Sequence, residues 1–339
     1  MFGKKGVQGL DGKKHMHRKS MFMQFMTPEN LEQIATLFEQ HWKNYVQRWQ
    51  NEDQINLFEQ TEEIIFRAAC EWMGIPFEAG KVTERTRHIA AMIDGAGGVA
   101  LRYFQGKKGR KDSEEWIIGL IEMVKSGKLK PVSDSILMQM INFKDLNGQT
   151  LDDKVLAVEI LNLIRPTVAI ARYIVFSAHA LHLNQQYQQK LKNGNDEMET
   201  WFVQEVRRFY PFFPFVVART RNEFEWNGFH FPADRKVLLD LYGTNHDSKI
   251  WQEPDKFYPE RFKNWNGSAF NFIPQGGGDH YKNHRCAGEW LTIKITESAV
   301  KMLTRKMTYN VPEQDLTLEM THMPALPKSR MIIKQVKWI

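Results

Sequence analysis

The segment FIPQGGGDHYKNHRCAGEW, residues 272–290, is the most informative part of this sequence for predicting the fold. Its glycine run at 276–278 gives a backbone that can turn tightly or approach a flat ligand closely. Cys286 follows this run, just before a helix that we expect to begin near Glu289. The basic pair at 284–285 and the N-terminus of that helix each stabilise negative charge, so we predict a lowered pKa for the Cys286 thiol.

Three interpretations of Cys286 are open. A lone cysteine is commonly a buried, unreactive side chain. A structural zinc site is disfavoured, because it needs several Cys or His ligands at short spacing and the other cysteine, Cys70, is far away in the sequence. A single thiolate presented by a glycine-rich loop instead suits haem iron, which needs one axial protein ligand and an open opposite face.

Composition places the chain among globular proteins. With 339 residues, 42% hydrophobic and 25% charged, it has room for one large or two packed domains and is unlike collagen, coiled coils and disordered chains. A net charge of +6 over this length is too small to indicate nucleic-acid binding. Two distant cysteines, no secretory signal and no apolar run of about 20 residues predict a cytoplasmic protein with no integral membrane span.

Residues 15–210 are predicted to be mostly helical. The charged segment QGKKGRKDSEE, residues 105–115, has no aromatic residues among its charges, and we interpret it as a solvated loop and not as a nucleic-acid arm. Apolar residues recur at spacings of three and four, the period of a helix, in residues 31–49, 62–75, 113–127 and 154–181.

Residues 211–339 are predicted to mix short strands with one long helix. Segment 222–232 alternates apolar and polar residues around Asn227-Gly228, which is a strong hairpin signal. The predicted fold class is therefore mainly α with a small β region. Two further strands are expected at 236–243 and 329–336, and a helix at 289–307 lies between them.

Arg165 and Pro166 stand in the middle of the apolar run 154–181. A helix that is apolar on nearly every face is buried, and a guanidinium there needs an anion or several acceptors because it cannot lose its proton. Pro166 frees the carbonyl of Asn162, so we expect a kink beside the charge. Arg165 is either half of a structural ion pair or a socket for the carboxylate of an otherwise apolar substrate.

Glu205 and Arg208 lie three residues apart, which places them on one face of a helix. Such a pair alone is commonplace. The later segment FYPERF contributes Arg261, and a second arginine that reaches Glu205 would hold the segment leading to the Cys286 loop. We expect these three residues to act as a scaffold and not in catalysis.

A dense group of basic side chains stands at the start of the first predicted helix. A solvated helix face is the simplest interpretation. Binding of anionic haem propionates is a sharper one, and nucleic-acid phosphate is the least supported. The group comprises Lys14, His15, His17, Arg18 and Lys19.

Together these motifs resemble the cytochrome P450 superfamily. The E-x-x-R pair at 205–208, the P-E-R-F segment at 259–262 and the H-x-C-x-G core at 284–288 occur in the family's order. QEVRRFYPF, FIPQGGG, NHRCAGEW and the Arg165-Pro166 pair look most like the bacterial fatty-acid peroxygenase branch, which includes α- and β-hydroxylases and olefin-forming decarboxylases. The resemblance covers residues 1–339 as a single domain and implies that about a fifth of the family's length would precede them.

The resemblance also implies a role for each matching residue. Cys286 would be the axial thiolate ligand of haem b, iron protoporphyrin IX, and Gly288 would adjoin this cofactor. Arg165 would anchor the substrate carboxylate, and Pro166 would form the bend that places it. The other implied roles are a haem-propionate contact at His15, a position above the haem at Gln8, an adjacent pocket position at Phe2, and a structural triad of Glu205, Arg208 and Arg261.

The implied function is a haem-thiolate peroxygenase that uses hydrogen peroxide to hydroxylate long-chain fatty acids at the α or β carbon, with oxidative decarboxylation as a second outcome. Gln8 favours hydroxylation. Ordinary family members carry an acid and an alcohol near the position of Arg165, and this chain does not. The substrate's own carboxylate would therefore act as the general acid–base group. Because hydrogen peroxide drives the reaction, no redox partner is expected. The alternatives are an electron-fed monooxygenase, a non-catalytic haem- or fatty-acid-binding protein, and an unrelated helical protein.

Overall fold

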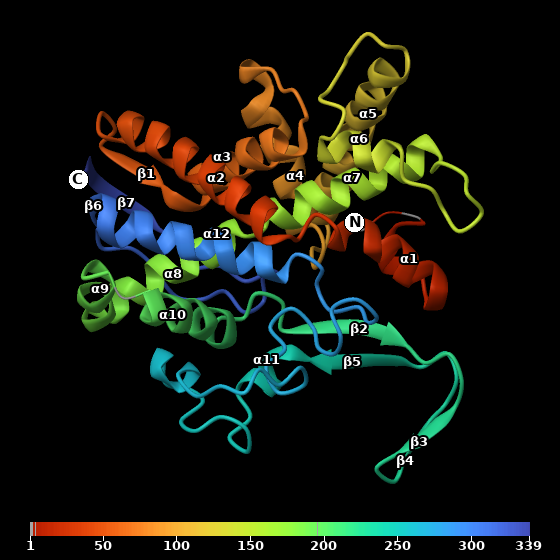
Figure 1. Ribbon diagram of the computed structural model, residues 1–339. Helices are drawn as coiled ribbons and strands as arrows, with labels where there is room; N and C mark the ends of the chain where they lie inside the picture. Colours follow the sequence, from red (N-terminus) through yellow and green to blue (C-terminus); the bar gives the residue numbers. More distant parts are fainter. Residues whose placement is uncertain (1–2, 4, 195) are drawn as a thin grey trace.

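Helices make up most of the molecule, as the apolar periodicity predicts (Figure 1). The structure is a computed structural model that describes residues 3, 5–194 and 196–339. The mainly α fold class with a small β region is therefore confirmed. The α-helices are α1 (Gly12–Met23), α2 (Pro28–Trp49), α3 (Leu57–Met73), α4 (Val82–Asp94), α5 (Leu101–Lys125), α6 (Ile136–Ile141), α7 (Asp153–Val168), α8 (Ala171–Leu183), α9 (Gln185–Lys192), α10 (Asp196–Phe209), α11 (Leu241–Asn245) and α12 (Glu289–Lys301).

Short strands form three small antiparallel sheets. One joins the strands in the order β1-β7-β6, and so pairs an early segment of the chain with its end, while β2 pairs with β5 and β3 with β4. Four shorter helical turns complete the secondary structure: η1 (Val7–Gly9), η2 (Ala79–Lys81), η3 (Pro259–Phe262) and the π-helical η4 (Met302–Lys306). The strands are β1 (Gln54–Asn56), β2 (Phe215–Arg219), β3 (Phe224–Trp226), β4 (Phe229–Phe231), β5 (Lys236–Asp240), β6 (Met307–Asn310) and β7 (Ile332–Trp338).

One large apolar core holds the helices together. It includes Trp42 of α2, Phe66 of α3, Ile164 of α7 and Ile295 of α12, each with no exposed surface. Helix α12 runs beside α2 and α8 through the middle of the molecule (Figure 1). The loop that carries Cys286 leads directly into α12, so this part of the site is supported by the core.

The long apolar run around Arg165 is interrupted, but not at the position where the proline predicts a kink. Helix α7 ends at Val168 and α8 begins at Ala171, so the interruption falls just after Pro166 and not at the proline itself. Both helices are almost entirely buried.

The prediction of a solvated loop at residues 105–115 is wrong, because the segment lies inside α5. Its lysines, arginine and glutamates are good helix formers, and its two glycines, Gly106 and Gly109, are buried where α5 packs against α4. A Cβ on Gly109 would lie 2.5 Å from the carbonyl oxygen of His88. The glycines therefore allow two helices to approach closely, and they do not mark a loop.

Replacing Gly109 with Ala should lower the free energy of unfolding by about 1–3 kcal/mol, because the added methyl group forces α5 away from the α4 backbone. Gly119→Ala on the same helix is the matched control. A Cβ there meets nothing within 4 Å, so this variant should gain up to about 1 kcal/mol from helix propensity. Urea unfolding of both variants measures the difference, and equal stability would contradict the close approach.

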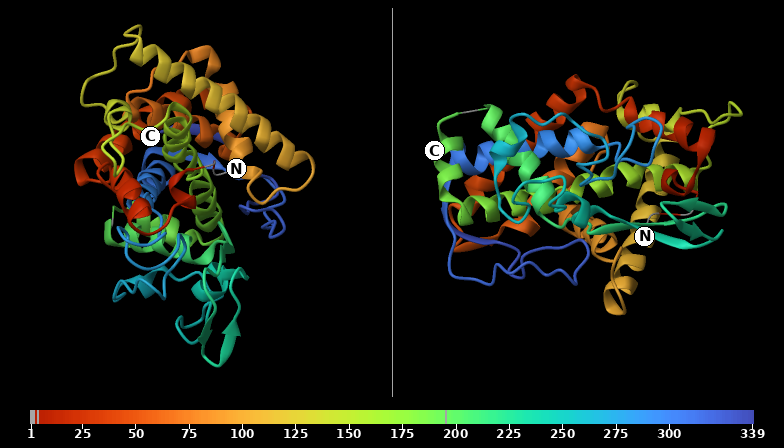
Figure 2. Two further views of the ribbon diagram at one scale, coloured as in Figure 1. Left: turned by 90° about the vertical axis from the view of Figure 1, so that its right-hand side faces the viewer. Right: turned by 90° about the horizontal axis from the view of Figure 1, so that it is seen from below.

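The predicted hairpin is confirmed, and one predicted strand is too long. Asn227 and Gly228 have φ of +51° and +80° and connect paired Trp226 and Phe229, as a tight hairpin turn requires. The strand expected at 236–243 ends at Asp240. The carboxylate of Asp240 accepts a hydrogen bond from the N–H of Gly243 and so caps the start of α11. The β2–β5 ribbon and this hairpin extend away from the helices (Figures 1 and 2).

None of the helices in the described part of the chain is both long and apolar enough to cross a membrane.

Candidate functional site

The glycine-rich loop holds Cys286 at the start of α12. The first and last glycines of the run 276–278 have φ of +89° and +85°, which glycine adopts without strain. A Cβ on the middle glycine would lie 2.8 Å from the carbonyl oxygen of Ala269. The N–H of Cys286 donates to the carbonyl of Gln275 at 3.0 Å, and α12 begins at Glu289 as predicted. The glycines thus shape a tightly folded loop that presents one thiol.

The predicted lowering of the Cys286 pKa is wrong: the pKa of this thiol is raised. Burial is the main cause, and the carboxylate of Glu289 adds to it. The N–H of Gly288 and the cations Lys19 and Arg207 act in the opposite direction without outweighing these effects. The sequence argument counted the basic neighbours of the cysteine and overlooked the acid three residues after it. A metal ion bound to the sulfur would reverse this balance, because coordination deprotonates a thiol.

Helix α1 packs its basic residues against the Cys286 loop. His15 stacks on His284 with ring centroids 3.9 Å apart, and Lys19 Nζ donates to the backbone carbonyls of Asn283 and Arg285. His15 and Lys19 are 4% and 3% exposed. The interpretation of a solvated face therefore holds for exposed Lys14 but is wrong for these two residues.

His15 is neutral in this setting. Burial is the main cause and, with the neighbouring side chains of His284 and Lys19, lowers its pKa to about 4. A neutral imidazole can donate one hydrogen bond to an anion, while Lys19 brings the positive charge. The two side chains together suit an acid group placed next to the Cys286 loop.

The residues around Cys286 fit a planar iron cofactor with acid groups at its edge. A Cβ on Gly288, two residues after Cys286, would meet nothing within 4 Å, so there is open space at this point of the loop. The buried hydroxyl of Tyr173 on α8 has no hydrogen-bond partner among the described residues, and burial together with the charge of Cys286 raises its pKa. A thiolate is a strong ligand of haem iron. The donor set, the open side of the loop and the cation at Lys19 are thus compatible with haem.

Arg165 is buried on α7, with 5% of its surface exposed. Its Nη2 donates to Oδ1 of Asn162 at 3.2 Å. Burial and the neighbouring charge of Arg110 lower its pKa to about 10, while Glu159 acts in the opposite direction. Arg165 therefore keeps its positive charge at neutral pH. The nearby acid Glu159 forms its own ion pair with Arg18 of α1, at 2.7 Å.

Neighbouring residues of α1 connect the Arg165 helix to the Cys286 loop. Arg18 forms its ion pair with α7, and Lys19, the next residue, binds the backbone of the Cys286 loop. Tyr173 of α8, the next helix after α7, is near enough to Cys286 for the two charges to interact. Helix α1 therefore contacts both the helix that carries Arg165 and the loop that carries Cys286.

The other predicted pocket residues come from α7 and from the N-terminal part of the chain. Pro166 lies within α7, next to Arg165. Gln8 lies in η1, and Gly6 separates it from α7: a Cβ on Gly6 would be 3.3 Å from Oε1 of Gln8 and 2.9 Å from Nδ2 of Asn162. Gln8 is therefore close to the helix face that carries Arg165. Phe2 lies outside the described residues.

The structure brings Glu205, Arg208 and Arg261 together. Both oxygens of Glu205 accept hydrogen bonds from Arg208 at 2.8 Å, and neither side chain has exposed surface. Arg261 Nε lies 3.1 Å from Glu205 Oε2, and the N–H of Tyr258 donates to Oε1 at 2.8 Å. This network joins α10 to η3, and its role as a scaffold stays a prediction.

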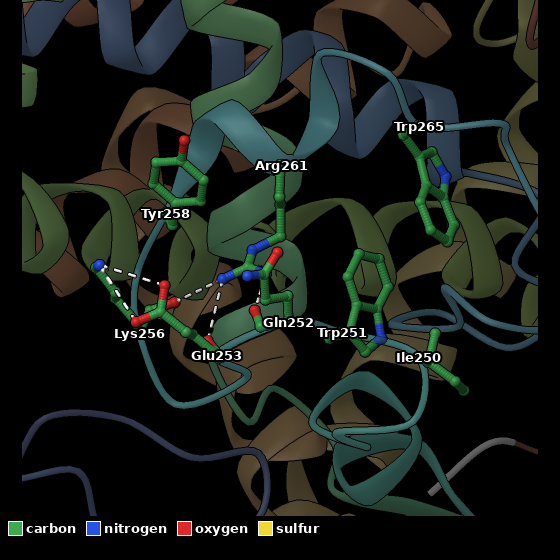
Figure 3. Close-up of a pocket in the computed structure, with 8 residues that line it drawn as sticks. All are labelled: Ile250, Trp251, Gln252, Glu253, Lys256, Tyr258, Arg261 and Trp265. Atoms are coloured by element: carbon green, nitrogen blue, oxygen red, sulfur yellow. Dashed lines mark hydrogen bonds and ion pairs between the residues drawn. The ribbon is translucent and has the colours of Figure 1, made fainter.

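A cavity of about 490 Å³ opens beside this network (Figure 3). Trp251 and Trp265 line it and stack with ring centroids 4.6 Å apart. Its charged side chains are already engaged, since Arg261 donates to three backbone carbonyls and Lys256 lies 3.4 Å from Glu253. With its cations paired, this cavity is a poor match for a fatty-acid carboxylate.

Sequence reasoning missed Glu289, the acid that braces the Cys286 loop. Its carboxylate accepts hydrogen bonds from His280 at 3.0 Å, from Arg285 at 2.6 Å and from Arg207. Although burial opposes it, Arg207 and the two hydrogen bonds hold the pKa of Glu289 far below its usual range. The spacing of four between Arg285 and Glu289 was a usable signal in the sequence. The contribution of Arg207, from a helix 82 residues away, was not.

Comparison with protein families gives one match: the family described as Cytochrome P450, over residues 195–333. Among curated proteins, cytochrome P450 71D18 from Mentha gracilis is 30% identical over 136 residues, which is 38% of this chain and 27% of that protein. The alignments to this relative and to cytochrome P450 71D94 of the same plant span only about a quarter of the length of those proteins.

Solved structures match over nearly the whole chain. Cytochrome P450SP alpha (CYP152B1) in complex with (R)-ibuprophen superimposes with a TM-score of 0.96 and 44% identity, covering 99% of this chain and 82% of that one. Cytochrome P450EX alpha (CYP152N1) with myristic acid has a TM-score of 0.95 and 42% identity, covering 100% of this chain and 82% of that one. The similarity therefore extends through α1, α7 and the Cys286 loop.

Proposed function

The chain belongs to the cytochrome P450 family, whose members are haem-dependent oxidoreductases, and from this premise we propose that it is a peroxygenase of long-chain fatty acids. The observation that carries the proposal is a buried, charged Arg165 on α7. Helix α1 joins α7 to the Cys286 loop, because Arg18 pairs with Glu159 of α7 and Lys19 binds the loop backbone. The similarity to a solved relative with bound myristic acid supports the choice of substrate class.

We infer that Cys286 holds haem b through its thiolate, with Gly288 beside the ring and with His15 and Lys19 next to its acid groups. Haem held in this way would supply the chemistry that activates peroxide, because thiolate ligation makes the iron more electron-rich. The protein would contribute the rest: the glycine loop sets the position of the sulfur, and Glu289 keeps that loop in place through hydrogen bonds from three side chains, His280, Arg285 and Arg207.

Arg165 would bind the carboxylate of the fatty acid. A pKa of about 10 means that Arg165 keeps all its protons at neutral pH, so it can bind and orient the acid but not exchange protons with it. The bound carboxylate oxygen is then the group positioned to take up and return a proton. Fixing the carboxylate also fixes the carbons next to it, so oxidation is expected at Cα or Cβ. Gln8, beside the same helix face, favours hydroxylation over decarboxylation.

The decisive experiment compares two ways of driving the reaction. The haem-loaded protein is incubated with myristic acid and hydrogen peroxide, or with NAD(P)H, a ferredoxin and its reductase. We expect 2- or 3-hydroxymyristate with peroxide alone. Product formation that needs the electron-transfer proteins would instead establish an electron-fed monooxygenase, and bound haem without product from either route would identify a non-catalytic binding protein.

Replacing Cys286 with Ser should remove the thiolate-type Soret band of the reduced carbonyl complex, because serine does not supply a soft thiolate ligand. Cys70→Ala is the matched control: Cys70 is fully buried in α3, and its loss should leave the spectrum unchanged. A thiolate-type band that persists in Cys286→Ser and disappears in Cys70→Ala would reject the assigned ligand.

A further inference from the structure

A line of buried polar side chains leads away from Arg165 along α7. Glu159, Asn162 and Arg165 follow one another at spacings of three residues, so each lies next to the following one on the helix. All three are buried, with exposed fractions of 0%, 6% and 5%. Buried polar groups are costly unless they bind one another, so their placement on an otherwise apolar helix calls for an explanation.

The hydrogen bonds along this line have a defined direction. Asn162 Nδ2 donates to Glu159 Oε2 at 2.8 Å, and Asn162 Oδ1 accepts from Arg165 Nη2 at 3.2 Å. A carboxylate only accepts and a guanidinium only donates, so the Asn162 amide can satisfy both neighbours in one orientation alone. Flipping the amide would place its NH2 group against the guanidinium and its oxygen against the carboxylate.

The far end of the line is anchored outside α7. The other oxygen of Glu159 accepts from Arg18 Nη1 of α1 at 2.7 Å. Arg18 is followed by Lys19, which binds the backbone of the Cys286 loop. The line therefore runs from α1, the helix that also braces the thiol loop, to the guanidinium of Arg165.

We propose that Glu159 and Asn162 are positioning residues that orient the Arg165 guanidinium for the carboxylate of the substrate. This inference rests on the proposed function. With Nη2 held by the Asn162 carbonyl and the amide itself held by Glu159, the guanidinium keeps one orientation before the acid arrives. Binding then avoids the loss of side-chain freedom that a mobile arginine would bring.

The line also keeps a competing anion away from Arg165. Glu159 lies six residues from Arg165 on α7, and its carboxylate is paired with Arg18. The neutral amide between them holds the guanidinium without neutralising it. Arg165 therefore keeps its affinity for an external carboxylate, which a direct ion pair with Glu159 would have removed.

The test measures binding and not turnover. Titration calorimetry of the haem-loaded protein compares myristic acid with 1-tetradecanol, which has the same chain length and no carboxylate. Asn162→Ala should weaken binding of the acid about tenfold and leave binding of the alcohol unchanged. Asn184→Ala, which also removes an amide hydrogen bond, to Ala180 in α8, is the matched control and should change neither.

A double-mutant cycle shows whether the effect passes through Arg165. In an Arg165→Ala background, Asn162→Ala should weaken acid binding by less than about twofold, because its partner is gone. An equal loss for acid and alcohol, or a tenfold effect that survives without Arg165, would overturn the inference. Glu159→Gln is the second variant if Asn162→Ala does not fold, and it should weaken acid binding alone by about threefold to tenfold.

The same data separate this inference from the proposed function. If Arg165→Ala leaves the preference for acid over alcohol unchanged, the carboxylate does not bind at Arg165 and the proposed function fails. If Arg165→Ala removes that preference while Asn162→Ala and Glu159→Gln keep it, only the positioning role fails.

Discussion

Replacing Arg165 with Ala should reduce peroxide-driven turnover of long-chain fatty acids by about 10³-fold or more while haem stays bound, since it removes both the binding partner of the carboxylate and the fixed position of the proton-transfer group. Arg165 is buried and keeps its charge, so no bulk cation can replace it. The rate of hydroxy-acid formation and the Soret spectrum of the same sample measure the two parts of this prediction.

Two controls make the Arg165 result interpretable. Arg165→Lys keeps a cation but loses the planar donor fork, so it should retain a small part of the activity. Arg48→Ala removes an exposed arginine at the end of α2 and should leave the rate unchanged. Undiminished turnover in Arg165→Ala, with haem present, would contradict the view that the substrate carboxylate takes part in the reaction.

Replacing Glu205 with Ala should lower the free energy of unfolding by about 3–5 kcal/mol, because it leaves the fully buried cation Arg208 without its partner. Arg261 loses its charged partner at the same time, and the N–H of Tyr258 loses its acceptor. The connection between α10 and η3 would weaken with them. Urea unfolding followed by far-UV circular dichroism measures the loss, and a variant that cannot be purified folded is the extreme form of the same outcome.

An exposed ion pair supplies the control for Glu205. Glu84 lies 3.0 Å from Lys81, and both side chains are about half exposed, so Glu84→Ala should cost less than about 1 kcal/mol. A similar, small loss for Glu205→Ala and Glu84→Ala would show that the buried network does not hold the fold together, and the predicted scaffold role would then be abandoned.

Much of the secondary structure was predictable because its determinants are local. The hairpin at Asn227-Gly228, for example, follows from two residues that tolerate positive φ. Segment 105–115 was misjudged for the opposite reason. Its glycines look like loop residues. The structure shows instead that Gly109 lies where the backbone of α4 leaves no space for a Cβ, and the local sequence does not indicate that contact.

The candidate site was only partly predictable for the same reason. Cys286, Arg165 and the Glu205–Arg208 pair are recognisable from their immediate neighbours in the chain. The pKa of Cys286 was predicted in the wrong direction because burial and the acid Glu289, and not the adjacent cations, dominate it. Lys19 was recognised only as one member of a basic group, and its buried contact with the Cys286 loop was not foreseen.

Most helices, the hairpin and the residues that carry the chemistry follow from local sequence, because helix period, turn geometry and a thiol before a helix are properties of a few neighbouring residues. The groups that surround these residues are set by packing between distant segments. Lys19 meets the loop from 264 residues away and Arg18 meets Glu159 from 141 residues away. Charge and desolvation act through space, so the electrostatic environment of Cys286 and the orientation of Arg165 depend on packing that no local pattern records.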